Sequence, residues 1–313
     1  MRLKGIFYRI HPAAKIFILI LTFVFSISLT MFLGLWVYII IAGKPIDMQS
    51  FNQMAFLNPN DLMALRYSQL LSHLGGFIFP ALLFAFFVGK TIQSYLKTNI
   101  WPQINSMILA FLIVIAIAPA INYLMEFNNS LTLPESLSGL DNWIRQKEEQ
   151  AGILTNTLLG VSSVQALIFN IFLIAVIPAI GEEFIFRGII LQIFKDWTKN
   201  AHLAIWISAI LFSGFHLQFF GFLPRMLLGV LFGYMVYYSG NIWVPVFAHF
   251  VNNAAAVLFF YLNHNQITSN NIDNIGTGQN DYWLAIVSAL IVFALMFLMR
   301  RHELKIRNPY KLN

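Results

Sequence analysis

Residues 165–194 read QALIFNIFLIAVIPAIGEEFIFRGIILQIF, and Glu182, Glu183 and Arg187 are the only charged side chains among them. About 20 apolar helical residues cross the hydrocarbon core of a bilayer, so this stretch is long enough to span a membrane. At the bilayer centre each charged side chain costs roughly 2.5 kcal/mol or more on insertion scales. The sequence therefore predicts a membrane-spanning helix whose charges have a partner or a function.

The composition of the whole chain agrees with a membrane environment. Of its 313 residues, 58% are hydrophobic and 10% are charged, whereas a soluble domain carries about a quarter charged residues. The net charge of +6 comes from positive charges at the ends of apolar stretches rather than from one basic run. We therefore expect the lipid bilayer as a partner and no nucleic acid. The absence of cysteine excludes disulfides, thiolate metal ligands and a cysteine nucleophile.

Seven further apolar stretches have the length of a membrane span, which predicts an all-α, polytopic integral membrane protein of about eight transmembrane helices. The first apolar stretch of the chain, 15–44, is too long for the core of a signal peptide, so we expect it to be retained. Ser239-Gly240-Asn241 divides the long apolar stretch near the end of the chain into two spans. The expected spans are 15–44, 68–89, 103–125, 165–194, 201–222, 223–238, 242–262 and 282–299.

The distribution of Lys and Arg predicts the orientation of these spans. With eight spans both termini lie on one side, and that side then holds about 14 of the 19 Lys and Arg residues, as cytoplasmic segments do. We expect both termini to be cytoplasmic, in the plasma (inner) membrane if the host is bacterial. Residues 1–150 would form an N-terminal region of three spans with an acidic external loop at 126–150. Residues 151–313 would form the membrane core and a basic C-terminal tail.

The buried charges differ in the partners that their spacing allows. Glu183 and Arg187 are separated by four residues, so they share a helix face and can form an ion pair. This pair alone could simply lock two helices together. Glu182 points about 100° away and has no partner within its helix, which makes it a candidate general base.

Two more polar clusters occur in later spans. His216 lies 15 residues after Ala201, and Glu182 lies 13 residues before Lys195, so both should lie about 20 Å from the same turn. His249 and Asn253 share a helix face and could stabilise an oxyanion, hold a ligand, or only bond neighbouring helices. The other histidines have no polar companion at helical spacing and are expected to be interfacial or incidental: His11, His73, His202, His264 and His302.

Several protease signatures are missing from the sequence. There is no His-Glu-x-x-His zinc motif. Ser213-Gly214 lacks the glycine two residues before the serine that a Gly-x-Ser-Gly nucleophile requires, and the predicted spans contain no Asp for an aspartyl dyad. The remaining candidate is a site of glutamate and histidine.

Three motifs in successive spans resemble those of the CAAX protease and bacteriocin-processing (CPBP) family. They are Glu182-Glu183-x-x-x-Arg187, Phe212-x-x-x-His216 and His249-x-x-x-Asn253. The family comprises intramembrane endopeptidases, including type 2 CAAX prenyl proteases and bacterial abortive-infection proteins. The resemblance covers about a third of the chain. The eight-helix architecture of the family agrees with the number of predicted spans.

The resemblance implies a role for each matched residue. Glu182 would activate water with His216, while His249 and Asn253 would stabilise the tetrahedral oxyanion. Glu183 and Arg187 would hold the helix of Glu182 in place. We favour a mechanism without a metal or other cofactor, because Asn253 beside His249 suits oxyanion donation better than zinc ligation. The alternative is a zinc-dependent metalloendopeptidase in which Glu182, His216 and His249 bind Zn²⁺.

Two other classes of function remain open from the sequence. Buried Glu and His also mark ion pathways, so the protein could be a transporter or proton relay, although no inverted repeat is visible. It could also be a non-catalytic membrane protein that kept the motifs for stability. If it is a protease, its partner is a peptide or protein substrate, with or without a lipid modification.

Overall fold

The computed structural model describes residues 3–43, 59–268, 275–277 and 281–307. Within these residues the secondary structure consists of helices, without a β-strand. Three short π-helical segments interrupt the longer helices. The elements are α1 (Pro12–Ala42), α3 (Pro59–His73), η2 (Leu74–Ile78), α4 (Phe79–Val88), α5 (Ile92–Leu96), α6 (Ile104–Ser130), η3 (Glu135–Leu137), α7 (Ser138–Leu159), α8 (Val164–Asn170), η4 (Ile171–Val176), α9 (Ile177–Glu183), η5 (Phe184–Ile190), α10 (Leu191–Thr198), α11 (Ala201–Phe215), α12 (Phe222–Ser239), α13 (Trp243–His264) and α14 (Tyr282–Arg307).

A helix occupies each of the eight predicted spans, which confirms the all-α polytopic fold. By length and composition, six helical stretches of the described chain can cross a membrane: Pro12–Ala42, Leu62–Val88, Ile104–Ser130, Val164–Thr198, Trp243–His264 and Tyr282–Ile306. The other two predicted spans are α11, a shorter apolar helix of 15 residues, and α12, which has 18 residues. The predicted break after α12 is also present, because Gly240 ends that helix with a φ of 61°.

The predicted span 201–222 is too long. Helix α11 ends at Phe215, so His216 follows the helix, and α12 begins at Phe222. Asn128 of α6 fixes this turn: its Nδ2 donates to the carbonyl of Phe219 at 2.7 Å, and its Oδ1 accepts from the N–H of Leu223 at 3.2 Å. The turn therefore depends on a contact with a helix far away in the sequence.

The predicted loop 126–150 is mostly helical. Helix α6 continues to Ser130, and α7 begins at Ser138 and crosses residue 150, the expected boundary between the two halves of the chain. An ion pair of 2.7 Å between Arg145 and Asp141, four residues apart, supports α7. The expected division at residue 150 therefore falls inside a helix.

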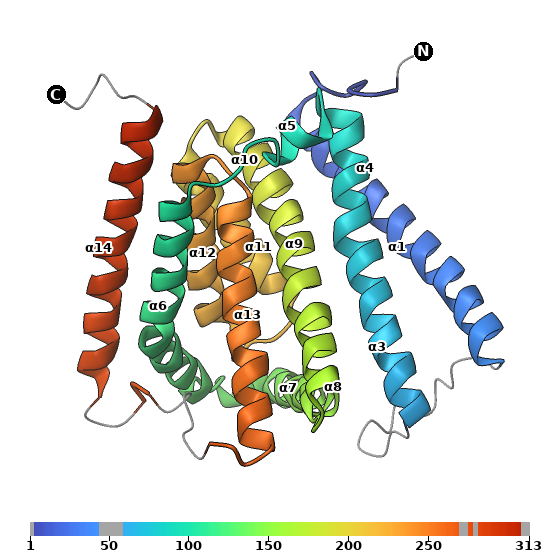
Figure 1. The fold of residues 1–313 in the computed structure, drawn as a ribbon, viewed down its shortest axis with the longest axis vertical. Coiled ribbons are helices and arrows are strands. Elements are labelled where there is room, and N and C mark those ends of the chain that lie inside the picture. Colours follow the sequence, from blue (N-terminus) through green and yellow to red (C-terminus); the bar gives the residue numbers. More distant parts are fainter. Residues whose placement is uncertain (1–2, 44–58, 269–274, 278–280, 308–313) are drawn as a thin grey trace.

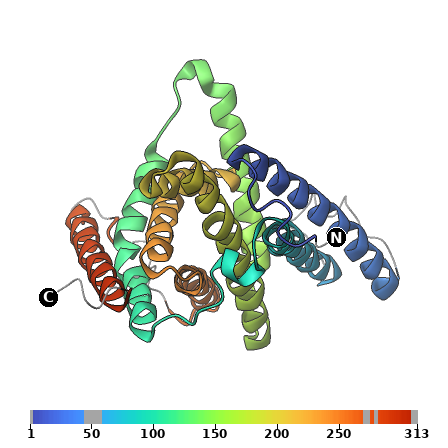
Figure 2. The ribbon, with the colours of Figure 1, turned by 90° about the horizontal axis from the view of Figure 1, so that it is seen from above.

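The long helices form one bundle, with α14 at one edge and the hairpin of α1 and α3–α4 at the other (Figure 1). The start of α1 and the end of α14 lie at the same end of the bundle, as an even number of spans requires. Helix α7 lies across the opposite end and extends sideways from the bundle in the view from above (Figure 2).

The N-terminal hairpin packs directly on the helix that carries the acidic pair. A Cβ added at Gly181 would lie 2.8 Å from the Cβ of Phe77, which is too close for any side chain. One buried core also joins Phe84 of α4 to Ile189 of η5 and Phe212 of α11. The first half of the chain is therefore part of the same packed unit as the second.

Candidate active site

Glu182 and Glu183 end α9, between the two π-helical segments η4 and η5. Pro178 lies in the first turn of α9 and has no N–H to donate to the preceding turn. That preceding turn is the wider, π-helical segment η4. Wide turns of this kind occur often at functional sites. Both carboxylates are buried, Glu183 completely and Glu182 with 6% of its surface exposed.

Glu183 and Arg187 form the ion pair that their spacing predicts. The Nη1 of Arg187 lies 2.7 Å from the Oε1 of Glu183, and its Nη2 donates to the carbonyl of Gly229 in α12 at 3.0 Å. The guanidinium also lies 4.5 Å from the ring centre of Phe212. Arg187 thus ties three elements together (η5, α11 and α12).

His249 connects this ion pair to Glu182. Its Nδ1 lies 2.9 Å from the Oε1 of Glu183, and its Nε2 lies 3.8 Å from the Oε2 of Glu182. Because an ionised carboxylate only accepts hydrogen bonds, Nδ1 is the donor to Glu183. The ring also stacks on Phe232, with 5.3 Å between ring centres. These contacts turn Nε2 of His249 toward Glu182.

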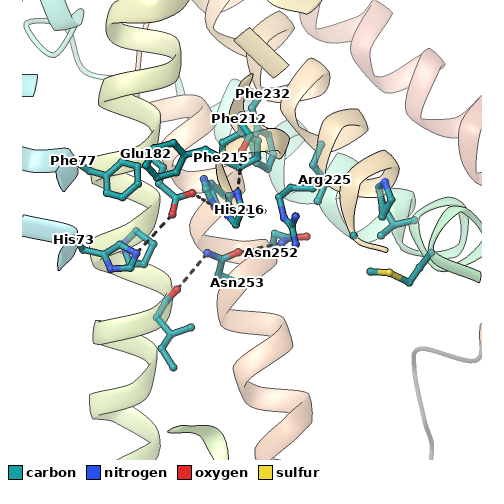
Figure 3. Close-up of a pocket in the computed structure, with 18 of the residues that line it drawn as sticks. His73, Phe77, Glu182, Phe212, Phe215, His216, Arg225, Phe232, Asn252 and Asn253 are labelled. Atoms are coloured by element: carbon teal, nitrogen blue, oxygen red, sulfur yellow. Dashed lines mark hydrogen bonds and ion pairs between the residues drawn. The ribbon is translucent and has the colours of Figure 1, made fainter. Parts of the chain in front are cut away.

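A cavity of about 540 Å³ brings the four predicted catalytic residues together, and Figure 3 shows Glu182, His216 and Asn253 around it. Glu182, His216, His249 and Asn253 line it from α9, the turn after α11, and α13. The other lining residues are Gln69, His73, Phe77, Ile121, Met125, Ile174, Pro178, Phe212, Phe215, Gly221, Pro224, Arg225, Leu228, Phe232 and Asn252. The wall of the cavity is therefore largely apolar, and a few polar side chains face into the cavity beside Glu182.

His216 and Asn253 are held by backbone carbonyls. The Nδ1 of His216 lies 2.9 Å from the carbonyl oxygen of Phe212, one turn earlier. The Nδ2 of Asn253 donates to the carbonyl of Ile174 at 3.3 Å, and its Oδ1 accepts from Asn252. The structure places both side chains at the cavity, while their chemical roles stay predictions.

The expectation that His73 is incidental is wrong. His73 lines the cavity, and its Nε2 lies 3.7 Å from the Oε1 of Glu182. Its partner lies on another helix, so a search for companions at helical spacing could not find it. The depth of His73 in its predicted span is a usable signal. His73 lies 16 residues before Gly89, the end of that span, which is about 24 Å along a helix and close to the depth of about 20 Å expected for Glu182.

Arg225 is a second cavity residue that the motifs do not contain. Its side chain lines the cavity that contains Glu182. Its Nη2 donates to the Oε1 of Gln218 at 2.8 Å, and Figure 3 shows it across the cavity from His73. The cavity therefore carries a positive charge opposite its carboxylate.

The zinc alternative requires three ligand atoms about 2 Å from one ion. Among the described residues, no group of three or more His, Asp and Glu side chains is arranged to hold a metal ion. The Nδ1 atoms of His249 and His216 bond to Glu183 and to a carbonyl, which leaves the Nε2 of each ring available, as in metal-binding histidines. Because Glu182, His216 and His249 do not form such a group among the described residues, the site does not fit a three-ligand zinc ion, and we derive no step through a metal.

Comparisons with known proteins show similarity over about a third of the chain. The Bacillus subtilis (strain 168) protein "Uncharacterized protein YpbD" is 25% identical over 116 residues, which are 36% of this chain and 54% of that protein. "Putative membrane peptidase YdiL" from the same organism is 31% identical over 103 residues, 33% of this chain and 42% of that protein. The match thus spans about half the length of these curated relatives. No solved structure matches significantly.

Residues 164–255, from α8 into α13, match a family described as type II CAAX prenyl endopeptidase Rce1-like. This segment contains Glu182, His216, His249 and Asn253, whereas His73 lies outside it. The resemblance expected from the three motifs is confirmed: residues 164–255 of this multi-pass membrane protein are similar to the Rce1-like family of type II CAAX prenyl endopeptidases.

Proposed function

We propose that the protein is an intramembrane endopeptidase that hydrolyses a peptide bond with water activated by Glu182. The observation that carries this proposal is the shared cavity of Glu182, His216, His249 and Asn253. The family match over the same residues supports it, as does the name of the Bacillus subtilis relative, which describes a membrane peptidase.

In the first step of the proposed reaction, Glu182 accepts a proton from a water molecule while the water oxygen bonds to the peptide carbonyl carbon. The carbonyl oxygen becomes an oxyanion, to which Asn253 donates a hydrogen bond. His249 donates a second one from Nε2 in its doubly protonated form, since its Nδ1 already donates to Glu183. When the C–N bond breaks, the leaving nitrogen takes the proton from Glu182. Glu183 and Arg187 do not line the cavity, and they act by holding His249 and the helix of Glu182.

The buried positions of Glu182 and His249 suit this chemistry. Hydrogen bonds and charges are stronger where water is largely excluded, because the local dielectric is low. We propose a peptide or protein as the substrate, with or without a lipid modification. We also propose that both termini are cytoplasmic, in the plasma membrane if the host is bacterial.

Quantitative proteomics of membrane peptides tests this proposal and identifies the substrate. Cells that contain the wild-type protein are compared with cells that contain Glu182→Gln at equal abundance. We expect a set of cleaved peptides that the wild type produces and Glu182→Gln does not. Identical peptide profiles in the two strains would contradict the proposal.

A further inference from the structure

His73 belongs to a part of the chain that the family match does not include. It is the last residue of α3, and η2 follows it directly. Its side chain is 13% exposed, and its ring stacks on Phe77 with 5.6 Å between ring centres. The close packing of Phe77 on Gly181 holds this segment against α9, so the position of His73 relative to Glu182 is fixed by the backbone.

The hydrogen bonds of His73 determine which nitrogen faces Glu182. The Nδ1 lies 3.0 Å from the carbonyl oxygen of Gln69, one turn earlier in α3. A carbonyl oxygen only accepts, so Nδ1 carries the hydrogen. In the neutral ring, Nε2 then presents a lone pair, and this nitrogen lies 3.7 Å from the Oε1 of Glu182.

Two hydrogen-bond acceptors at this separation suit a bridging water. Neither Nε2 nor a carboxylate oxygen can donate to the other, and 3.7 Å exceeds a direct hydrogen bond. One water molecule can span such a gap by donating one hydrogen to each acceptor. Both of its hydrogens are then fixed, and its lone pairs are left to face the cavity.

We propose that His73 is a further catalytic residue, which holds the attacking water between its Nε2 and the Oε1 of Glu182. This inference rests on the proposed function. As the water oxygen bonds to the peptide carbon, the hydrogen on the Glu182 side moves to Oε1, while the other hydrogen bond to His73 keeps the oxygen aimed at the carbonyl. The proton that Glu182 takes is the one that later reaches the leaving nitrogen.

The position of the other histidines supports this assignment. Among the described histidines, His73 and His249 lie within 4 Å of a Glu182 oxygen. His249 approaches the other oxygen, Oε2, so each ring lies near a different oxygen of the carboxylate. His216 lines the same cavity, but its Nδ1 bonds to the carbonyl of Phe212 in the preceding helix.

The test uses two substitutions at His73 and a matched control. His73→Phe keeps a ring that can stack on Phe77 but has no nitrogen, whereas His73→Gln restores an oxygen that accepts a hydrogen bond. His264→Phe is the control, because His264 also stacks on a phenylalanine, Phe260, and does not line the cavity. Initial rates are measured in proteoliposomes with a peptide substrate from the proteomic comparison.

We expect His73→Phe to lower kcat about a hundredfold at nearly unchanged KM, because water positioning acts on the chemical step. His73→Gln should recover about tenfold of this loss, and His264→Phe should match the wild type. A wild-type kcat for His73→Phe, an effect on KM alone, or equal losses for Phe and Gln would each overturn the assignment. Failure of the proposed function would look different, because wild-type protein and Glu182→Gln would then give the same peptide profiles and the same cleavage rate.

Discussion

The fully buried guanidinium of Arg187 has its ion-pair partner, Glu183, one turn away and a carbonyl acceptor on a neighbouring helix. Removing it with Arg187→Ala leaves the Glu183 carboxylate buried without its cation, which typically costs about 3–5 kcal/mol. We expect a lower Tm and a lower folded yield in detergent. Arg301→Ala is the control, because Arg301 is exposed and its guanidinium lies over Phe297. Equal Tm values for the two variants would contradict this account of Arg187.

Residue spacing predicted the contacts within one helix and missed those between helices. The pair of Glu183 and Arg187 follows from a separation of four residues, and the structure contains it. His73 and Glu182 are more than a hundred residues apart in the chain, so no local pattern joins them. Only their similar depth in the membrane could have suggested the contact.

At the scale of helices, the approach of α12 to α11 depends on Gly229. A Cβ added there would lie 3.0 Å from the Cβ of Ala209 and 3.3 Å from the Nη2 of Arg187. Gly229→Ala should therefore force the helices apart and lower stability by about 1–3 kcal/mol. The measurement is the thermal unfolding midpoint of the purified protein.

Gly214→Ala is the matched control for that experiment. Gly214 is also helical, but a Cβ added there meets nothing within 4 Å. Alanine should leave stability unchanged or raise it by about 0.5–1 kcal/mol, because it restricts the unfolded chain more than glycine does. If Gly229→Ala were as stable as Gly214→Ala, the tight contact between α11 and α12 would be refuted.

Hydropathy predicted where helices cross the membrane, because span length depends only on local composition. It did not predict α7 or the turn before α12, since both depend on contacts with distant residues. Glu148 of α7 accepts from the N–H of Phe220 at 3.0 Å, and Asn128 of α6 bonds both sides of the same turn. The turn places His216 beyond the end of α11, where the sequence pattern predicted a continuous helix.

At the scale of the whole molecule, metal content separates the two proposed mechanisms. We expect active, purified protein to contain less than a tenth of a zinc ion per chain, as a rough limit, and to keep its activity in a chelator. The measurement is elemental analysis of the sample whose activity is assayed. One tightly bound zinc per chain, with activity lost on chelation and restored by zinc, would replace the metal-free mechanism.

Transport is the other whole-molecule alternative, because a buried Glu beside histidines also suits proton movement. We expect proteoliposomes with wild-type protein to take up protons no faster than those with Glu182→Gln. A pH-sensitive dye enclosed in the vesicles measures this. Proton uptake that depends on Glu182 would favour a transporter.

The central claim is that Glu182 activates the water that cleaves a peptide bond within the membrane cavity. The most direct measurement is cleavage of the identified peptide by reconstituted protein in H₂¹⁸O, with mass spectrometry of the product. We predict that the wild type adds ¹⁸O to the new carboxyl group and that Glu182→Gln, folded to the same yield, forms almost no product. Cleavage by Glu182→Gln at the wild-type rate would contradict the claim.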